Sequence, residues 1–228
     1  MEKKFILTDK FVINSFGIKL FQIKCTKSFK YAQKGDFGGY VEKEGNLDQE
    51  NDAWVFGNAR VFGNARVSSN ARVSGDAWVS DNARVSGDAW VSDNAWVSSN
   101  AWVFGDALVS GYAWVSGDAR VFGNARVSSN ARVSGDAWVS GNAWVSGDAD
   151  IENDNEHCGF DGFGSCNRHT HAYMTKEKKV EIICGCFRGS IEEFEKKVEE
   201  THSGTVYEKQ YKSIINVIKI KFGLTDFT

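Results

Sequence analysis

The chain has 228 residues, a formal net charge of −3, 42% hydrophobic and 25% charged residues, and no proline. That length holds one large domain or two small ones, and the composition is ordinary for a globular protein. No segment approaches the roughly 18 apolar residues of a membrane span, and no basic-then-apolar leader opens the sequence. A transmembrane protein is therefore excluded, and we expect a cytoplasmic protein whose five cysteines are reduced.

Residues 1–49 predict an N-terminal β cap. They carry nine lysines against six acidic residues. Residues 5–25 are rich in β-branched and aromatic side chains, interrupted by Asn14-Ser15-Phe16-Gly17, and this pattern predicts two hairpin strands. A cap is required here because the end of a solenoid exposes unpaired strand edges and an open core.

Residues 50–151 contain an unbroken repeat with a period of six. Valine recurs at every sixth residue from Val55 to Val145, and Ile151 closes a series of 17 units. Each unit has a small residue, a large one and a branched one, followed by residues that favour tight turns. Alternation along a strand places Ala and Val inside and Trp or Arg outside. Three units then form one 18-residue triangular coil, which predicts a mostly β, single-stranded parallel β-helix of about six coils.

The outward positions fall into three columns when every third unit is read. The columns are Trp54, Arg72, Trp90, Leu108, Arg126 and Trp144; Arg60, Trp78, Trp96, Trp114, Arg132 and Asp150; and Arg66, Arg84, Trp102, Arg120 and Trp138. The second column stacks three indoles, Trp78, Trp96 and Trp114, between Arg60 and Arg132, an order that suits aromatic stacking and cation–π contact. These five residues are the predicted binding surface.

Three explanations of these columns stay open. The indoles and arginines stiffen the rod, or they are buried in a homo-oligomer interface or under another part of the chain, or they recognise a partner. Such a surface also stacks on single-stranded nucleic acid. Residues 50–151 carry 7 arginines against 11 acidic residues, however, and a net charge of −4 attracts phosphates poorly.

Residues 152–228 predict a C-terminal α+β module. A hairpin is expected to turn near Lys178, and Ser190 with Glu193 forms a capping box that opens a helix ending near His202. A second helix is expected over 206–222.

This module also holds the cysteines and histidines that could bind zinc. Cys158, Cys166, Cys184 and Cys186 lie close in the sequence to His157, His169 and His171. The spacing lacks a C-x-x-C pair, so we expect buried thiols and surface histidines, with no metal and no cofactor. Which face each histidine takes depends on the hairpin register.

The repeat resembles the hexapeptide repeat of left-handed parallel β-helices, with Val55 and Ala59, or Val79 and Ala83, in its aliphatic and small positions. The flanks, over residues 34–55 and 184–202, resemble a group of phage- and prophage-encoded repeat proteins. The first resemblance implies a left-handed triangular coil. The second implies a small cytoplasmic accessory protein of mobile elements, and some phage accessory proteins block host defence systems, CRISPR nucleases among them.

The leading functional hypothesis is a non-catalytic, protein-binding β-solenoid that acts on a host or phage protein, with inhibition of a host defence system as its specific form. We expect a homo-oligomer, either a dimer or a trimer. Two alternatives remain. One is an acyltransferase-like enzyme of the hexapeptide class using His157, His169 or His171, although no histidine occurs between residues 52 and 151. The other is a structural element of a virion or its assembly.

Overall fold

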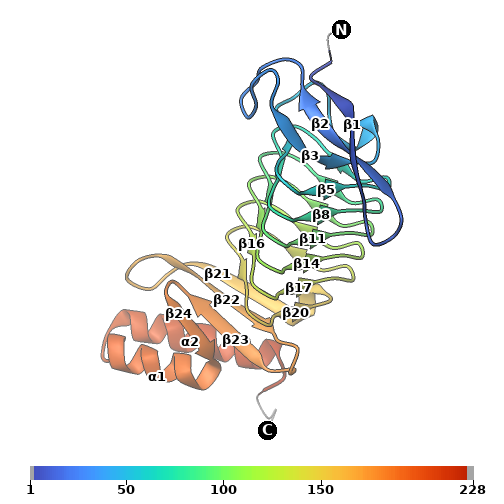
Figure 1. Cartoon of the computed structure of the whole chain (residues 1–228). Helices are drawn as coiled ribbons and strands as arrows, with labels where there is room; N and C mark the ends of the chain where they lie inside the picture. Colours follow the sequence, from blue (N-terminus) through green and yellow to red (C-terminus); the bar gives the residue numbers. More distant parts are fainter. Residues whose placement is uncertain (1–2, 225–228) are drawn as a thin grey trace.

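In the computed structural model, which describes residues 3–224, the repeat forms a rod of stacked coils with a cap at each end (Figure 1). Each hexapeptide supplies a two-residue strand, consisting of the large residue and the valine or isoleucine after it. These strands are β4 Trp54–Val55, β5 Arg60–Val61, β6 Arg66–Val67, β7 Arg72–Val73, β8 Trp78–Val79, β9 Arg84–Val85, β10 Trp90–Val91, β11 Trp96–Val97, β12 Trp102–Val103, β13 Leu108–Val109, β14 Trp114–Val115, β15 Arg120–Val121, β16 Arg126–Val127, β17 Arg132–Val133, β18 Trp138–Val139, β19 Trp144–Val145 and β20 Asp150–Ile151. The predicted mostly β solenoid of about six coils is confirmed.

The coils have three faces, and each face is a parallel sheet. One sheet contains β5-β8-β11-β14-β17-β20, another contains β4-β7-β10-β13-β16-β19, and the third contains β6-β9-β12-β15-β18. Residues one coil apart are register partners, as Trp78, Trp96 and Trp114 are on the first face. Every Ala and Val of the repeat lies inside the coil and is buried, because only small and branched side chains fit the narrow interior.

The corner position of each unit is occupied by glycine, serine or aspartate because the backbone there is left-handed. Every sixth residue from 57 to 147 has a positive φ, a conformation that costs an L-residue with a side chain about 1–2 kcal/mol. Most of these positions hold glycine. The others hold Ser69, Asp81, Asp93, Ser99 and Ser129.

The N-terminal cap continues one face of the rod. Strands β1 (Phe5–Ile13) and β2 (Lys19–Cys25) form the predicted antiparallel hairpin, β2 pairs with β3 (Phe37–Val41), and β3 pairs in parallel with β5. A 3-10 turn, Glu44–Asn46, follows β3.

Lys4 closes the open end of the first coil. Its ammonium group donates hydrogen bonds to the carbonyl oxygens of Asn51 and Ala53 and lies over the Phe29 ring. Burial lowers the pKa of Lys4 to about 8. The cap therefore satisfies backbone carbonyls that would otherwise be left without a partner inside the protein.

The C-terminal module covers the other end of the rod with an antiparallel sheet. After a 3-10 turn, Asp154–Glu156, the strands run in the order β21 (His157–Phe163), β22 (Arg168–Met174), β23 (Val180–Cys184) and β24 (Phe187–Ser190). One face of the sheet contributes Tyr173 and Ile183 to the solenoid core. The other face packs against two helices (Figure 1).

The helices follow the sequence prediction closely. Helix α1 spans Ile191–His202, and its capping box has Ser190 accepting from the Glu193 amide while the Glu193 carboxylate accepts from the Ser190 amide. Helix α2 spans Val206–Lys221. Neither of these helices is long and apolar enough to cross a membrane, nor is any other in the described residues.

Candidate functional site

The three indoles of the predicted binding surface form a ladder on neighbouring coils. We call Trp78, Trp96 and Trp114 the indole ladder. The rings of Trp96 and Trp114 are stacked, with centroids 5.5 Å apart and planes 12° apart. Trp78 meets Trp96 edge to face, at 5.8 Å and 65°. Both geometries are favourable for aromatic pairs.

A guanidinium group lies at each end of the indole ladder. The Arg60 guanidinium carbon is 5.2 Å from the Trp78 ring centroid, and that of Arg132 is 5.5 Å from the Trp114 centroid. The structure therefore brings together the five residues that the column predicted. Arg60 is half-buried and Arg132 is exposed, so the two ends differ in their access to a partner.

Serine side chains in the preceding coil accept the indole N–H groups. Trp96 donates to Ser80 at 3.1 Å and Trp114 to Ser98 at 3.2 Å. The same contact, with the same spacing along the chain, recurs where Trp90 meets Ser74. The indole N–H groups of Trp96 and Trp114 are thus already used within the rod, and these two residues offer a partner their ring faces. Sequence analysis missed these serines, although a serine 16 residues before the tryptophan is a signal at Trp90, Trp96, Trp102 and Trp114.

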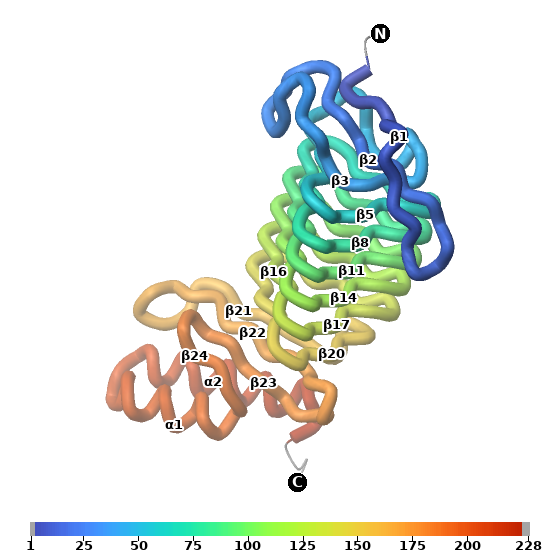
Figure 2. The backbone as a smooth tube through the Cα atoms, viewed as in Figure 1, coloured from blue at the N-terminus to red at the C-terminus, as the bar shows by residue number. Residues whose placement is uncertain are grey.

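The β1–β2 hairpin covers one end of the indole ladder. Its tip carries Phe16, whose ring centroid lies 6.1 Å from that of Trp78, 6.5 Å from Trp96 and 6.2 Å from Phe62. Figure 2 shows this tip beside the coils that hold β8 and β11. Part of the predicted surface is therefore buried under another segment of the same chain.

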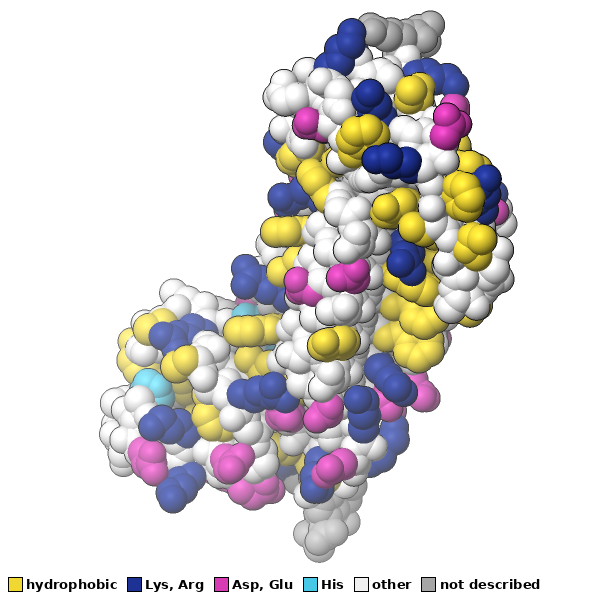
Figure 3. Space-filling model, viewed as in Figure 1, with side chains coloured by type: hydrophobic (Ala, Val, Ile, Leu, Met, Phe, Trp, Pro, Cys, Tyr) yellow, Lys and Arg dark blue, Asp and Glu magenta, His cyan; other side chains and the backbone are white. Residues whose placement is uncertain are grey.

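The opposite end of the indole ladder is open to solvent. Trp114 keeps 37% of its surface exposed. In Figure 3 hydrophobic side chains gather below the hairpin, and basic side chains follow them along the rod. We call the exposed Trp114 and Arg132, together with the half-buried Trp96 that stacks on Trp114, the free end of the ladder.

Within the part of the chain that the structure describes, the repeat arginines have no acidic partner. Among residues 3–224, no carboxylate lies within 4.0 Å of the guanidinium groups of these seven arginines. Most repeat aspartates lie at the corners, away from the arginines on the flat faces. Asp150 is the register partner of Arg132, but it also lies beyond this distance. The flat faces of the rod thus combine exposed aromatic rings with uncompensated positive charge.

The other two columns are arranged differently. Trp54 is 1% exposed because Phe5 and Phe29 of the cap cover it. On the third face, Arg120 stacks on Trp138 at 4.7 Å, and this indole is 46% exposed. The Arg120–Trp138 pair lies on a different sheet from the indole ladder and therefore serves as a matched control for it.

The four cysteines considered for zinc do not come together as a metal site. Cys184 faces the helices, and Cys158 packs into the same helix-side core, where burial raises its thiol pKa to about 11. Cys166 and Cys186 are exposed on turns and, with Cys184, line a cavity. No group of three or more His, Cys, Asp or Glu side chains in residues 3–224 is arranged to hold a metal ion.

The histidines lie on the solenoid side of the sheet, opposite Cys184. Register pairs His171 with Ile183 and Thr170 with Cys184, which separates the imidazole from the thiol. His171 is fully buried and its Nδ1 accepts the Trp144 amide at 3.1 Å, while its Nε2 lies 3.1 Å from His157 Nδ1. His171 Nε2 therefore carries the proton, and His157 Nδ1 accepts it. The expectation of surface histidines is wrong for His171, because the hairpin register turns it inward.

Comparison with known proteins supports the class of fold. Four stretches of the repeat match the family model described as YdcK Beta solenoid repeat, over residues 65–81, 77–93, 119–135 and 131–147. The chain is thus a β-solenoid repeat protein, similar in these stretches to that family. No curated protein matches the chain.

Proposed function

We propose that this chain is a non-catalytic binding protein that recognises a protein partner through the free end of the ladder. Trp96 and Trp114 present stacked ring faces whose N–H groups are already satisfied, and Arg132 follows directly after them. Tryptophan and arginine are the residue types most enriched among side chains that dominate binding energy.

The observation that carries this proposal is the absence of ion pairs at the repeat arginines of residues 3–224. Asp150 stands opposite Arg132 in the next coil but lies beyond ion-pair distance, so the guanidinium charge stays available to a partner. An uncompensated guanidinium beside the exposed Trp114 indole favours a partner that presents a carboxylate next to an aromatic or aliphatic side chain.

The contact between the β1–β2 hairpin and the indole ladder indicates which kind of side chain packs well on these rings. Phe16 lies at the covered end of the ladder and meets Trp78 edge to face, with an angle of 71° between the ring planes. A partner side chain of similar chemistry at Trp114 would extend the same arrangement by one coil. The proposed occupant is therefore an acidic protein segment with an aromatic residue.

We further propose that this partner belongs to a host defence system, for example a CRISPR nuclease, and that the chain is a phage-encoded inhibitor acting in the host cytoplasm. This refinement is supported by the resemblance of residues 34–55 and 184–202 to phage accessory proteins. The mode of action would be steric, since a rigid rod that occupies an acidic surface blocks whatever that surface normally binds.

The test compares three versions of the full chain. They are the wild type, the double variant Trp114→Ser/Arg132→Gln, and the control Trp138→Ser/Arg120→Gln on another face. Proteins captured from host cells are identified by mass spectrometry, and the captured partner is then purified and titrated. We expect the ladder variant to weaken binding by at least 30-fold, about 2 kcal/mol, and the control to change it less than threefold.

Equal binding by all three versions would contradict the proposal. Sedimentation of the same proteins tests the homo-oligomer expectation. If the wild type is a dimer or trimer and only the ladder variant is a monomer, this surface joins copies of the chain, and the proposal of a foreign partner there is wrong.

A further inference from the structure

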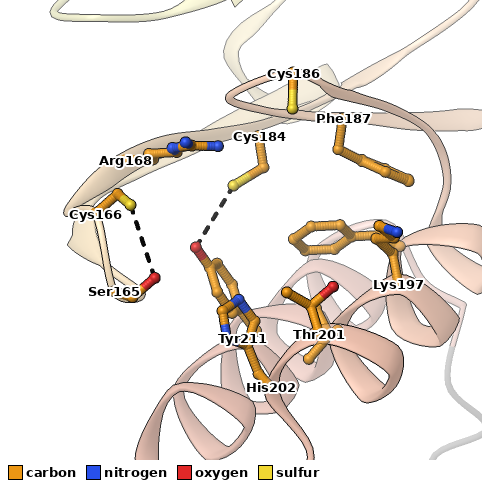
Figure 4. A pocket seen from close by; sticks show the side chains of 12 residues that line it. Ser165, Cys166, Arg168, Cys184, Cys186, Phe187, Lys197, Thr201, His202 and Tyr211 are labelled. Carbon is orange, nitrogen blue, oxygen red and sulfur yellow. Dashed lines mark hydrogen bonds between the residues drawn. The ribbon is translucent and has the colours of Figure 1, made fainter.

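A cavity of about 250 Å³ lies in the C-terminal module, far along the chain from the ladder (Figure 4). It opens between the β21–β22 turn, the β23–β24 turn and helix α1. Its lining includes Phe187, Phe194, His202 and Tyr211 on the inner wall and Arg168 and Lys197 at the rim.

The inner wall of the cavity is aromatic. Phe194 and Tyr211 are buried and meet edge to face, with centroids 5.6 Å apart at 82°. Phe187 adds a third ring, 5.0 Å from Phe194, and His202 stacks on Tyr211 at 5.5 Å. A flat ring entering this space can pack against several aromatic edges and faces.

The rim of the cavity is cationic. The lining includes Arg168 and Lys197 but neither aspartate nor glutamate. Lys197 is within 3.5 Å of Glu200, whereas no carboxylate in residues 3–224 is within ion-pair distance of Arg168. Gly185 leaves room for this guanidinium, since a Cβ there would collide with Arg168 Nη1.

Within residues 3–224, the hydroxyl of Tyr211 at the cavity wall has a sulfur atom as its only hydrogen-bond partner. Tyr211 is 5% exposed, and its Oη accepts from the Cys184 thiol at 3.7 Å. Sulfur is a weak hydrogen-bond partner, and Cys184 Sγ already accepts from the Thr170 hydroxyl at 3.2 Å. The Tyr211 hydroxyl is thus a donor that an oxygen atom in the cavity would satisfy better.

We propose that this cavity binds a small aromatic carboxylate, with the ring against Phe187, Phe194 and Tyr211 and the carboxylate beside Arg168. An apolar cavity of ~150 Å³ already accommodates benzene, so 250 Å³ holds a ring with a short acidic arm. Arginine matches a carboxylate through two parallel N–H groups, which makes the charge essential to recognition. This site is independent of the ladder and of its protein partner.

The experiment is a protein-observed NMR titration of the full chain with phenylacetate up to about 10 mM. We expect saturable shifts at the cavity and a Kd on the order of 0.1–1 mM, as is usual for a ligand of about ten non-hydrogen atoms. Phenylacetamide, which has the same shape without the charge, is expected to bind at least tenfold more weakly.

Variants assign the contacts. Arg168→Gln is expected to weaken binding about tenfold, and Tyr211→Phe about threefold. The control Lys212→Gln removes an exposed cation outside the cavity and is expected to leave the Kd unchanged. If Tyr211→Phe does not fold, Arg168→Gln, which changes an exposed residue at the rim, still tests whether the cavity binds the carboxylate.

Three results would overturn this proposal. They are the absence of saturable binding at 10 mM, equal binding of acid and amide, and an unchanged Kd in Arg168→Gln. Because the ladder is intact in every one of these proteins, failure here leaves the proposed partner binding unaffected.

Discussion

The solenoid and the C-terminal module are built on different rules, although one sheet face joins them. In the solenoid, position within a six-residue unit decides whether a side chain is inside, outside or at a corner. In the module, each sheet face has a different neighbour, so that Tyr173 joins the solenoid core while Ala172, beside it, joins the helix-side core. In the solenoid, the orientation of each side chain can therefore be predicted from its position in the repeat. In the module, the orientation depends on the register in which the strands pair.

The largest expected effect comes from a substitution that destabilises the C-terminal module more than the solenoid. Phe194→Ala empties part of the core between the helices and the sheet and is expected to lower the free energy of unfolding of the module by about 3–5 kcal/mol. Circular dichroism at 222 nm follows the helices, and tryptophan fluorescence follows the solenoid, because all eight tryptophans lie between residues 54 and 144. We expect the helix transition to move much further than the fluorescence transition. Equal shifts would mean that both regions unfold as one unit.

The corners of the solenoid are the next place to test. Gly117 has a φ of +66°, and a Cβ there would lie 2.7 Å from the Gly135 carbonyl oxygen in the next coil. Gly117→Ala is expected to lower the free energy of unfolding by about 2–3 kcal/mol, measured by tryptophan fluorescence in denaturant.

Gly141→Ala is the matched control for this corner. Its φ is +64°, but a Cβ there meets nothing within 4 Å, so only the backbone cost of about 1–2 kcal/mol applies. The same loss in both variants would show that contact between successive corners contributes nothing.

Acid is expected to loosen the junction between the two regions. Burial lowers the pKa of His157, and burial followed by the charges of its neighbouring histidines lowers the pKa of His171 well below its ordinary range. The unfolded chain takes up protons near pH 6.5, while the folded chain does not until lower pH. Stability is therefore full above about pH 6.5 and falls below it, by up to about 1.4 kcal/mol per pH unit for each histidine.

Thermal unfolding between pH 5 and 8 measures this loss. His171→Asn keeps an acceptor for the Trp144 amide but cannot titrate, so we expect the slope of stability against pH to decrease in this variant. An unchanged slope would assign the acid sensitivity to other groups.

The smallest expected effect concerns the hydrogen bond between the Trp114 indole and Ser98. Ser98→Ala removes the acceptor of the indole N–H and is expected to cost about 0.5–1 kcal/mol. Ser116 holds the equivalent position in the next coil, where Arg132 stands in place of the tryptophan, so Ser116→Ala is expected to cost less. Denaturant titrations of both variants, followed by fluorescence, compare these two losses directly.

The solenoid could be predicted well from the sequence because the period of six residues determines both where the backbone turns and which side chains point inward. The inward Val97, the outward Trp96 and the corner Gly117 all follow from position within the unit. The covering of Trp78 by Phe16 could not be predicted, because it is a contact between segments more than 60 residues apart in the sequence, and no local pattern encodes it.

The module shows the same limit. The strands, the turn at Lys178 and both helices are visible in local sequence signals. The inward orientation of His171 and the separation of the thiols are set by pairing between β22 and β23, which composition and spacing do not encode. The cavity beside Tyr211 depends on how α1 and α2 rest on the sheet, and for that reason it has no sequence signature.

Because register partners lie one full coil apart along the chain, the length of this rod can change only in whole coils without disturbing its ends. Removing one whole coil brings the hairpin and the C-terminal module closer together and keeps both in the same orientation. Removing a single hexapeptide turns one end by a third of a revolution about the axis, so that the module no longer lies on the same side relative to the free end of the ladder. The spacing between the two proposed sites is therefore adjustable in discrete steps, while their relative direction is built into the repeat.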